Sequence, residues 1–102
     1  MVVYNVTVSI DEAVALEWLE WMRKKHVPEI METGLFKECK LCRVHGEEAG
    51  GLTYAVMYTA FSIEHLENFN EHFEPRLQSM QLEKFKGRYV DFKTTLSVIE
   101  EF

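Results

Sequence analysis

The sequence predicts an α+β fold in which two amphipathic helices cover one face of an antiparallel four-stranded sheet. Four segments have the alternating or apolar character of strands, and two segments between them carry apolar stripes at helical spacing. The order along the chain is β-α-β-β-α-β, which defines the ferredoxin-like split βαβ sandwich. Residues 1–102 are expected to form one domain of this kind.

The first strand and the first helix occupy the N-terminal third of the chain. In residues 2–10, apolar side chains alternate with small or polar ones, which is typical of a strand with one buried face. Asp11 is expected to cap a helix that runs to about His26. Because proline disfavours helical geometry at the preceding residue, Pro28 should kink or restart this helix, which ends before Gly34.

A hairpin follows the first helix. Residues 35–45 and 52–61 are the predicted second and third strands, and a glycine-containing loop at 47–51 joins them. On the second strand, Cys39 and Cys42 are three residues apart, so their side chains should point to opposite faces. These thiols can therefore neither form a disulfide nor share a metal ion.

The second helix and the fourth strand complete the fold. Ser62 is expected to cap the helix, Pro75 to kink it and Gly87 to end it, before a strand at residues 88–99. The apolar stripe of this helix is Leu66, Phe69, Phe73, Leu77 and Met80.

The two faces of the predicted sheet differ in character. The larger apolar side chains on strands one, three and four have even numbers and are expected to face the helices: Val6, Val8, Tyr54, Val56, Tyr58, Val90, Phe92, Leu96 and Val98. The other face is small and polar: Asn5, Thr7, Ser9, Thr53, Ala55, Met57, Thr59, Asp91, Lys93, Thr95 and Ser97. This face either stays open to water or lies against a second copy of the chain and encloses a polar cavity; we favour the second arrangement.

Composition excludes several classes of function. Seventeen acidic residues against eleven basic ones give a net charge of −6, which argues against nucleic acid or an anionic membrane surface as a partner. The N-terminus has a strand pattern rather than that of a signal peptide, and no apolar stretch is long enough to span a membrane. Two cysteines without an export signal predict a cytoplasmic protein with free thiols. Without nucleotide-binding or metal-ligating motifs, we expect no cofactor and no metal.

Two histidines are the candidate catalytic residues. His26 falls inside the apolar arc of the first helix, where Glu29 is placed to orient the imidazole and keep its pKa near neutrality for acid/base work. The alternative, which we favour, is a core histidine bonded to the backbone near the proline kink. His72 lies beside the Pro75 kink, where backbone groups are freed.

The candidate ligand-binding residues lie on the polar sheet face and on the first helix. Trp18 occupies the apolar arc of that helix, where it fits either the core or a platform for a ligand. The full set is Asn5, Thr7, Thr53, Met57, Lys93 and Trp18.

Several motifs spread over nearly the whole chain resemble a family of bacterial domains of unknown function of about this length. They are Asn5-Val6-Thr7-Val8, Trp18-Leu19-Glu20-Trp21-Met22, His26-Val27-Pro28-Glu29, Gly50-Gly51-Leu52-Thr53-Tyr54 and Pro75-Arg76-Leu77. The resemblance implies a dimeric α+β barrel, in which two ferredoxin-like subunits pair their sheets. The broader superfamily is similar in architecture to cofactor-independent monooxygenases, muconolactone isomerases and polyketide cyclases, and some members place a histidine on the first helix or near the end of the second.

Three functions remain open. A homodimer that binds a small organic molecule, between the sheets or under the helices, ranks first. The second is a cofactor-independent enzyme of monooxygenase, isomerase or cyclase type, with His26 or His72 as acid/base on an aromatic or lactone-like substrate. The third is an interaction module whose acidic second helix docks a basic partner through Glu64, Glu67, Glu71 and Glu74.

Overall fold

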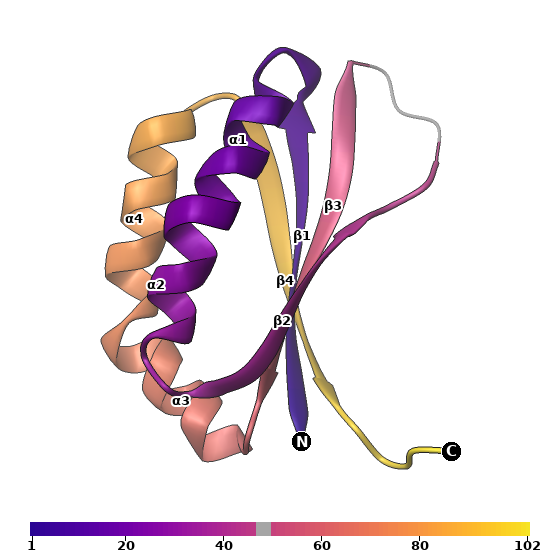
Figure 1. The fold of residues 1–102 in the computed structure, drawn as a ribbon, viewed down its shortest axis with the longest axis vertical. Helices are drawn as coiled ribbons and strands as arrows, with labels where there is room; N and C mark the ends of the chain where they lie inside the picture. The colour runs from indigo at the N-terminus through magenta and orange to yellow at the C-terminus, as the bar shows by residue number, and fades with distance from the viewer. Residues whose placement is uncertain (47–49) are drawn as a thin grey trace.

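The computed structural model describes residues 1–46 and 50–102, and its elements follow the predicted order (Figure 1). The strands are β1 (Val2–Asp11), β2 (Phe36–Arg43), β3 (Gly51–Ala60) and β4 (Tyr89–Ser97). The helices are α1 (Ala15–Trp21), α2 (Val27–Met31), α3 (Ile63–His72) and α4 (Glu74–Phe85). Residues 47–49 of the predicted hairpin loop lie outside the described residues. Among the described helices, none has the length and apolar character needed to cross a membrane.

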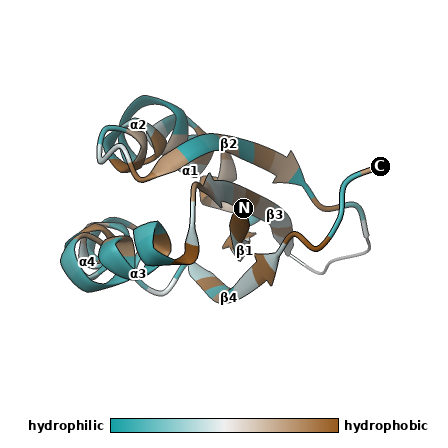
Figure 2. Cartoon of the chain, turned by 90° about the horizontal axis from the view of Figure 1, so that it is seen from below, coloured by the Kyte–Doolittle hydropathy of each residue, from teal (hydrophilic) through white to brown (hydrophobic). Residues whose placement is uncertain are grey.

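The sheet has the predicted ferredoxin-like topology. All its strand pairs are antiparallel, in the order β2-β3-β1-β4. The helices lie on one side of the sheet only, as Figures 1 and 2 show from two directions. The opposite side carries no other element of the described chain, and we call it the open face.

The first helical segment runs through Pro28 without a break. A π-helical turn, Met22–His26, joins α1 to α2, and the backbone N–H of Val27 donates to the carbonyl of Met22, five residues back. Val27 keeps helical φ and ψ of −63° and −46°, so the expected departure from helical geometry there does not occur, but the prediction that the helix restarts with Pro28 in a first turn is confirmed. Pro28 lies in the first turn of α2, where its missing N–H and fixed φ are tolerated.

Side-chain caps begin both helical segments, as predicted. The Asp11 carboxylate accepts a hydrogen bond from the Ala13 backbone N–H at 2.9 Å, which starts a 3-10 turn ahead of α1. The Ser62 hydroxyl accepts one from the His65 backbone N–H at 3.2 Å, which starts α3. These bonds satisfy donors that would otherwise lack partners in the first turn.

The second helical segment is divided rather than bent. Phe73, with φ −121°, interrupts it, so α3 ends at His72 and α4 begins at Glu74. Pro75 occupies the first turn of α4 and restarts the helix, where the sequence pattern predicts only a kink. Gly87, with φ 76°, then allows the tight turn into β4.

The main core lies between the helices and the central strands. Its largest fully buried side chains are Trp18, Phe69, Ile10, Leu66, Leu77, Val8 and Val56. The predicted apolar faces of both helices and of β1 and β3 are therefore confirmed.

β4 presents its polar side to the helices, which overturns the predicted orientation. Asp91 pairs with Val8 and Lys93 with Val6 across the β1–β4 ladder, so these polar residues share the helix side of the sheet. The apolar residues of β4 lie on the open face and are exposed: Val90 (71%), Phe92 (63%) and Leu96 (44%). The prediction assumed that every apolar strand face meets the core, and in β4 the apolar face is the uncovered one.

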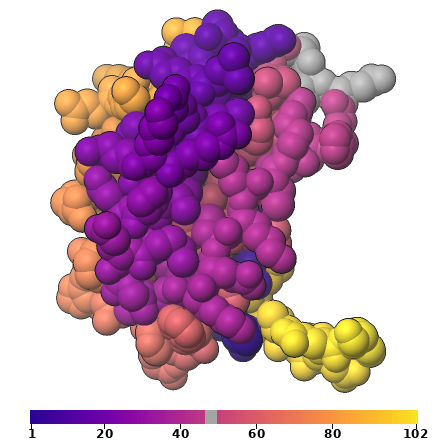
Figure 3. All heavy atoms as spheres, in the orientation of Figure 1, coloured from indigo at the N-terminus to yellow at the C-terminus, as the bar shows by residue number. Residues whose placement is uncertain are grey.

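The open face is therefore more apolar than predicted. On β1 and β3 it carries Val3, Asn5, Thr7, Ser9, Thr53, Ala55, Met57 and Thr59, all half-buried. The exposed apolar residues of β4 adjoin this set, since Phe92 pairs with Thr7 and Leu96 with Val3. Beyond β4, the C-terminal residues project from the body of the molecule (yellow in Figure 3), and Ile99 and Phe102 are exposed.

Candidate functional site

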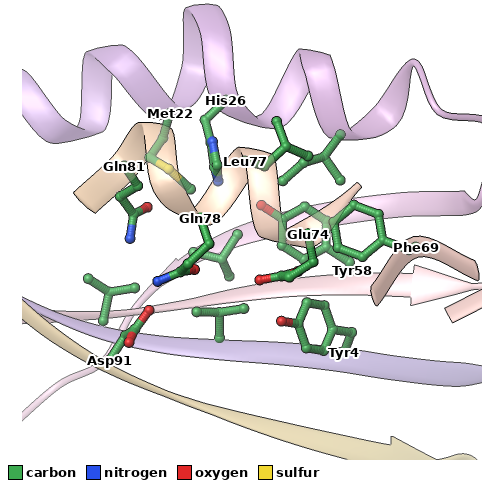
Figure 4. Close-up of a pocket in the computed structure, with 14 residues that line it drawn as sticks. Tyr4, Met22, His26, Tyr58, Phe69, Glu74, Leu77, Gln78, Gln81 and Asp91 are labelled. Carbon is green, nitrogen blue, oxygen red and sulfur yellow. The ribbon is translucent and has the colours of Figure 1, made fainter. Parts of the chain in front are cut away.

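A cavity lies between α4, the π-helical turn and the helix side of the sheet (Figure 4). Its polar side chains are Tyr4, His26, Tyr58, Glu74, Gln78, Gln81 and Asp91, and the rest of its wall is apolar. Inside its enclosed part, the centre of a water molecule can occupy a volume of about 20 Å³, which is room for one or two waters. Together with the part open to solvent, the space measures about 380 Å³.

Helix α4 supplies three polar residues to the cavity. Glu74, Gln78 and Gln81 are spaced four and three residues apart, so they share one face of the helix with the buried Leu77. Gln81 is only 4% exposed, and neither glutamine side chain has a hydrogen-bond partner among the described residues. Gln78 and Gln81 were not among the predicted site residues, and Glu74 was predicted only as part of the acidic face of this helix; a polar stripe beside an apolar one at helical spacing was the available signal.

An ion pair connects α4 to the sheet across the cavity. The Nζ of Lys93 lies 2.9 Å from Oε1 of Glu74, whose side chain is 18% exposed. Burial raises the pKa of the Tyr4 hydroxyl, and the charge and hydrogen bond of Glu74 raise it further. Tyr4 therefore stays protonated at physiological pH, and its hydroxyl donates a hydrogen bond to the Glu74 carboxylate.

The π-helical turn places His26 in the wall of the cavity. Met22 and His26 stand at the two ends of this turn, and both line the cavity. His26 is 9% exposed, and its imidazole stacks on the ring of Trp21 with centroids 4.5 Å apart and planes 22° apart. The predicted inward orientation of His26 agrees with the structure.

The pKa of His26 is far from the near-neutral value that its catalytic role would need. Burial lowers it from 6.5 to about 4, and the nearby charge of Glu29 opposes this effect only in part. Glu29 lies toward solvent, where its carboxylate is 3.5 Å from Lys25 and 3.9 Å from Arg76. It therefore does not orient the imidazole as expected, and His26 is neutral at physiological pH.

Two buried polar atoms of the cavity have no hydrogen-bond partner among the described residues. They are Nδ1 of His26 and Oδ2 of Asp91. Buried polar groups in folded proteins nearly always have a partner, whether protein or ordered water. Two unpaired atoms in one cavity therefore indicate a site for a polar occupant.

The predicted residues of the sheet lie apart from this cavity. Asn5, Thr7, Thr53 and Met57 are on the open face, where the Asn5 side chain donates to the Thr7 hydroxyl at 3.2 Å. Lys93, expected among them, lies on the helix side, because β4 has the reverse orientation.

The remaining predicted residues are also outside the cavity. Trp18 is fully buried in the core, with its ring 5.2 Å from that of Tyr54, and its Nε1 has no partner among the described residues. His72 is exposed at the end of α3, beside Glu71. Among the predicted site residues, only His26 thus lies in the cavity wall. Lys93 does not line the cavity but forms an ion pair with Glu74, which does.

The two cysteines point to opposite faces of β2, as predicted. Cys39 pairs with Tyr58 and shares the helix side with it, whereas Cys42 pairs with Ala55 on the open face. Burial, with a smaller contribution from Cys42, raises the pKa of Cys39 to about 12, so its thiol is a poor nucleophile. Within residues 1–46 and 50–102, no group of three or more His, Cys, Asp or Glu side chains is arranged to hold a metal ion.

The depressed pKa of His26 predicts a pH-dependent loss of stability. The unfolded chain binds a proton at His26 near pH 6.5, whereas the folded chain binds it only near pH 4. Stability is therefore complete above pH 6.5 and falls as the pH drops toward 4, by up to about 3 kcal/mol from this residue. Urea unfolding at a series of pH values measures this loss.

The matched variants are His26→Phe, which keeps a ring against Trp21 but does not titrate, and His72→Gln at an exposed position. The wild type should lose more stability across this pH range than His26→Phe, and His72→Gln should behave as the wild type. Equal losses in the wild type and His26→Phe would contradict a buried neutral imidazole.

Fold and cavity together define a ferredoxin-like α+β domain with one uncovered sheet face and a polar cavity beneath its helices. The protein belongs to the DUF4286 family, described as a domain of unknown function, whose model matches residues 1–99. This confirms the predicted resemblance to a family of domains of about 100 residues. No curated protein sequence matches the chain.

Solved structures similar to this chain share its fold. A dimeric ferredoxin-like protein from an uncultured marine organism has a TM-score of 0.72 at 13% identity, covering 99% of this chain and 98% of its own. A second such protein from an uncultured marine organism has a TM-score of 0.70 at 13% identity, covering 100% and 98%. An ethyl tert-butyl ether D (EthD) family protein from Bacillus halodurans has a TM-score of 0.66 at 17% identity, covering 97% and 100%. At these identities, the similarity concerns the fold alone.

Proposed function

We propose that the protein is a homodimeric domain that binds a small polar organic molecule in the cavity beneath its helices. The observation that carries this proposal is the pair of buried polar atoms, Nδ1 of His26 and Oδ2 of Asp91, in residues that line one cavity; neither atom has a hydrogen-bond partner within residues 1–46 and 50–102. A carboxylate oxygen buried without a partner costs the fold stability unless an occupant satisfies it.

The open face supports the homodimer. Val90, Phe92 and Leu96 extend a half-buried surface on β1 and β3, and contiguous exposed apolar surface is typical of an interaction site. Two similar structures are described as dimeric ferredoxin-like proteins. A second copy of the chain on this face would cover the apolar residues and leave the helix-side cavity accessible.

The cavity limits the size of the ligand. Its enclosed part accepts a group about as large as a water molecule, and the mouth leads to solvent. We therefore place one small polar group of the ligand inside and a short apolar part against the wall, where Val6, Val8 and Met22 lie.

The alternatives receive less support from the same residues. A base with a pKa of about 4 has little driving force for proton abstraction at neutral pH, and His72 lies outside the cavity. For the interaction module, Glu74 faces Lys93 and the cavity instead of joining the acidic stripe on α3. The free thiols are consistent with a reducing compartment, and we place the protein in the cytoplasm.

Native mass spectrometry of the freshly purified protein tests the proposal. We expect a dimer with an additional small mass, up to one per subunit, that denaturation releases. Gln78→Leu, in the cavity wall, should reduce this occupancy, whereas Asn70→Leu, exposed on α3, should not. A dimer without bound mass, whose cavity resonances do not move with any of a panel of small polar compounds, would contradict ligand binding.

A further inference from the structure

The charges around the cavity are unbalanced. Two carboxylates, Glu74 and Asp91, face it, and one ammonium group, that of Lys93, is bound to Glu74 at 2.9 Å. The Asp91 carboxylate acts as a negative charge on Tyr4, and its Oδ2 has no partner among the described residues. The described part of the cavity therefore holds an excess of one negative charge, located at Asp91.

The neutral groups around the Asp91 carboxylate can accept hydrogen bonds from a bound ligand. His26 is more than nine-tenths buried and is unprotonated at physiological pH, and its Nδ1 has no partner in the part of the chain that the structure describes. Gln78 and Gln81 add carboxamides whose oxygens are free to accept. Figure 4 shows His26 approaching from the helix and Asp91 from the strand, with Gln78 and Gln81 on α4.

The size and lining of the cavity select among possible cations. An ammonium group is about the size of a water molecule and so fits the enclosed part, whereas a guanidinium group is larger. The apolar wall favours a short alkyl chain attached to it. A bound metal ion is disfavoured, because the described residues contain no cluster of three or more metal-ligating side chains.

We propose that the cavity binds a small primary alkylamine in its ammonium form, with the ammonium group beside the Asp91 carboxylate and the alkyl chain against Val6, Val8 and Met22. This inference rests on the proposed function and specifies its ligand class. An anion would face the unpaired carboxylate, and a neutral alcohol would leave its charge uncompensated. The ammonium group donates three hydrogen bonds and supplies the missing positive charge.

Three probes of equal chain length test the proposal: propylammonium chloride, 1-propanol and sodium propionate, each titrated into the intact protein at constant pH and ionic strength. The readouts are the NMR resonances of the side-chain amides of Gln78 and Gln81 and the indole N–H of Trp21. We expect saturable shifts with propylammonium and binding at least about tenfold weaker with the other two probes. Sodium and potassium chloride at the same concentration are the controls for metal cations.

Asp91→Asn is the decisive variant, and Glu71→Gln on the exposed side of α3 is its matched control. Asp91→Asn should weaken propylammonium binding at least about tenfold while leaving the melting temperature of the unliganded protein unchanged or higher. Glu71→Gln should bind as the wild type does. If Asp91 instead stabilises the fold, Asp91→Asn would lower the melting temperature of the unliganded protein.

The other outcomes separate this inference from the proposed function. Equal or stronger binding of 1-propanol or propionate, or propylammonium binding that survives Asp91→Asn, overturns the cation assignment and leaves a small-molecule site. Shifts of the same resonances with sodium or potassium alone overturn the organic character of the ligand. If no probe binds at any concentration that keeps the protein in solution, the inference fails. If native spectra then also show no bound mass, the proposed function fails as well.

Discussion

Replacing Trp18 with alanine is expected to lower the free energy of unfolding by about 3–5 kcal/mol. The side chain is 0% exposed and packs against Tyr54 in the centre of the core between α1 and the sheet. Replacement by alanine leaves a cavity, and the surrounding side chains fill it only in part because the protein interior is close-packed. A domain of this size has a total stability of roughly 5–15 kcal/mol, so the loss is a large fraction of the whole.

Leu16→Ala is the control for this prediction, because Leu16 lies on the same helix and is 83% exposed. Its unfolding free energy should change by no more than about 0.5 kcal/mol. Urea unfolding at one fixed protein concentration measures both variants, since dimer formation would make the apparent stability depend on concentration. A Trp18→Ala variant with nearly wild-type stability would show that Trp18 is not a packing residue.

Replacing Phe92 with glutamate is expected to weaken self-association by about a thousandfold or more. In a two-fold symmetric dimer each substitution occurs twice, and loss of an aromatic anchor costs about 2 kcal/mol per copy, which together correspond to that factor. Phe92 is 63% exposed in one chain and lies in the middle of β4, the edge strand of the sheet, where it adjoins Thr7 on the open face. Sedimentation equilibrium over a range of concentrations measures the change.

Leu82→Glu is the matched control, since Leu82 is a similarly exposed apolar residue on α4, away from the open face. It should leave association unchanged, and both variants should retain wild-type circular dichroism. If Phe92→Glu dimerises as the wild type does, the open face is not the interface. If the wild type is a monomer at all concentrations, the homodimer itself is refuted.

The fold could be predicted because its signals are local. Alternation in β1, the caps at Asp11 and Ser62 and the glycines that follow the two helical segments, Gly34 and Gly87, specify where elements begin and end. The side of β4 that faces the helices could not be predicted from such local signals. Periodicity shows that a strand has an apolar side, but an interior and an exposed association surface produce the same pattern. The register opposite β1, which places Asp91 beside Val8, is set by tertiary pairing.

The site was harder to predict than the fold. The inward position of His26 follows from helical spacing, but its pKa depends on how far tertiary packing removes water from the imidazole. The partnership of Glu74 with Lys93 joins residues from different elements, and nothing local distinguishes Glu74 from the exposed acids on α3. Asp91 entered the cavity only because β4 has the reverse of its predicted orientation.

The π-helical turn lets the first helical segment hold one more residue than an α-helix of the same span, while α1 and α2 both keep their buried faces toward the sheet. Deleting one residue of Met22–His26 would convert this turn into an ordinary α-turn, and α2 is expected to keep its orientation. Adding a residue would instead rotate α2 by about 100° relative to α1 and turn Ile30 away from the core. A relative with one residue fewer in this segment is therefore expected to keep the same fold, so a single gap there in an alignment would be a change of turn type rather than evidence of a different domain.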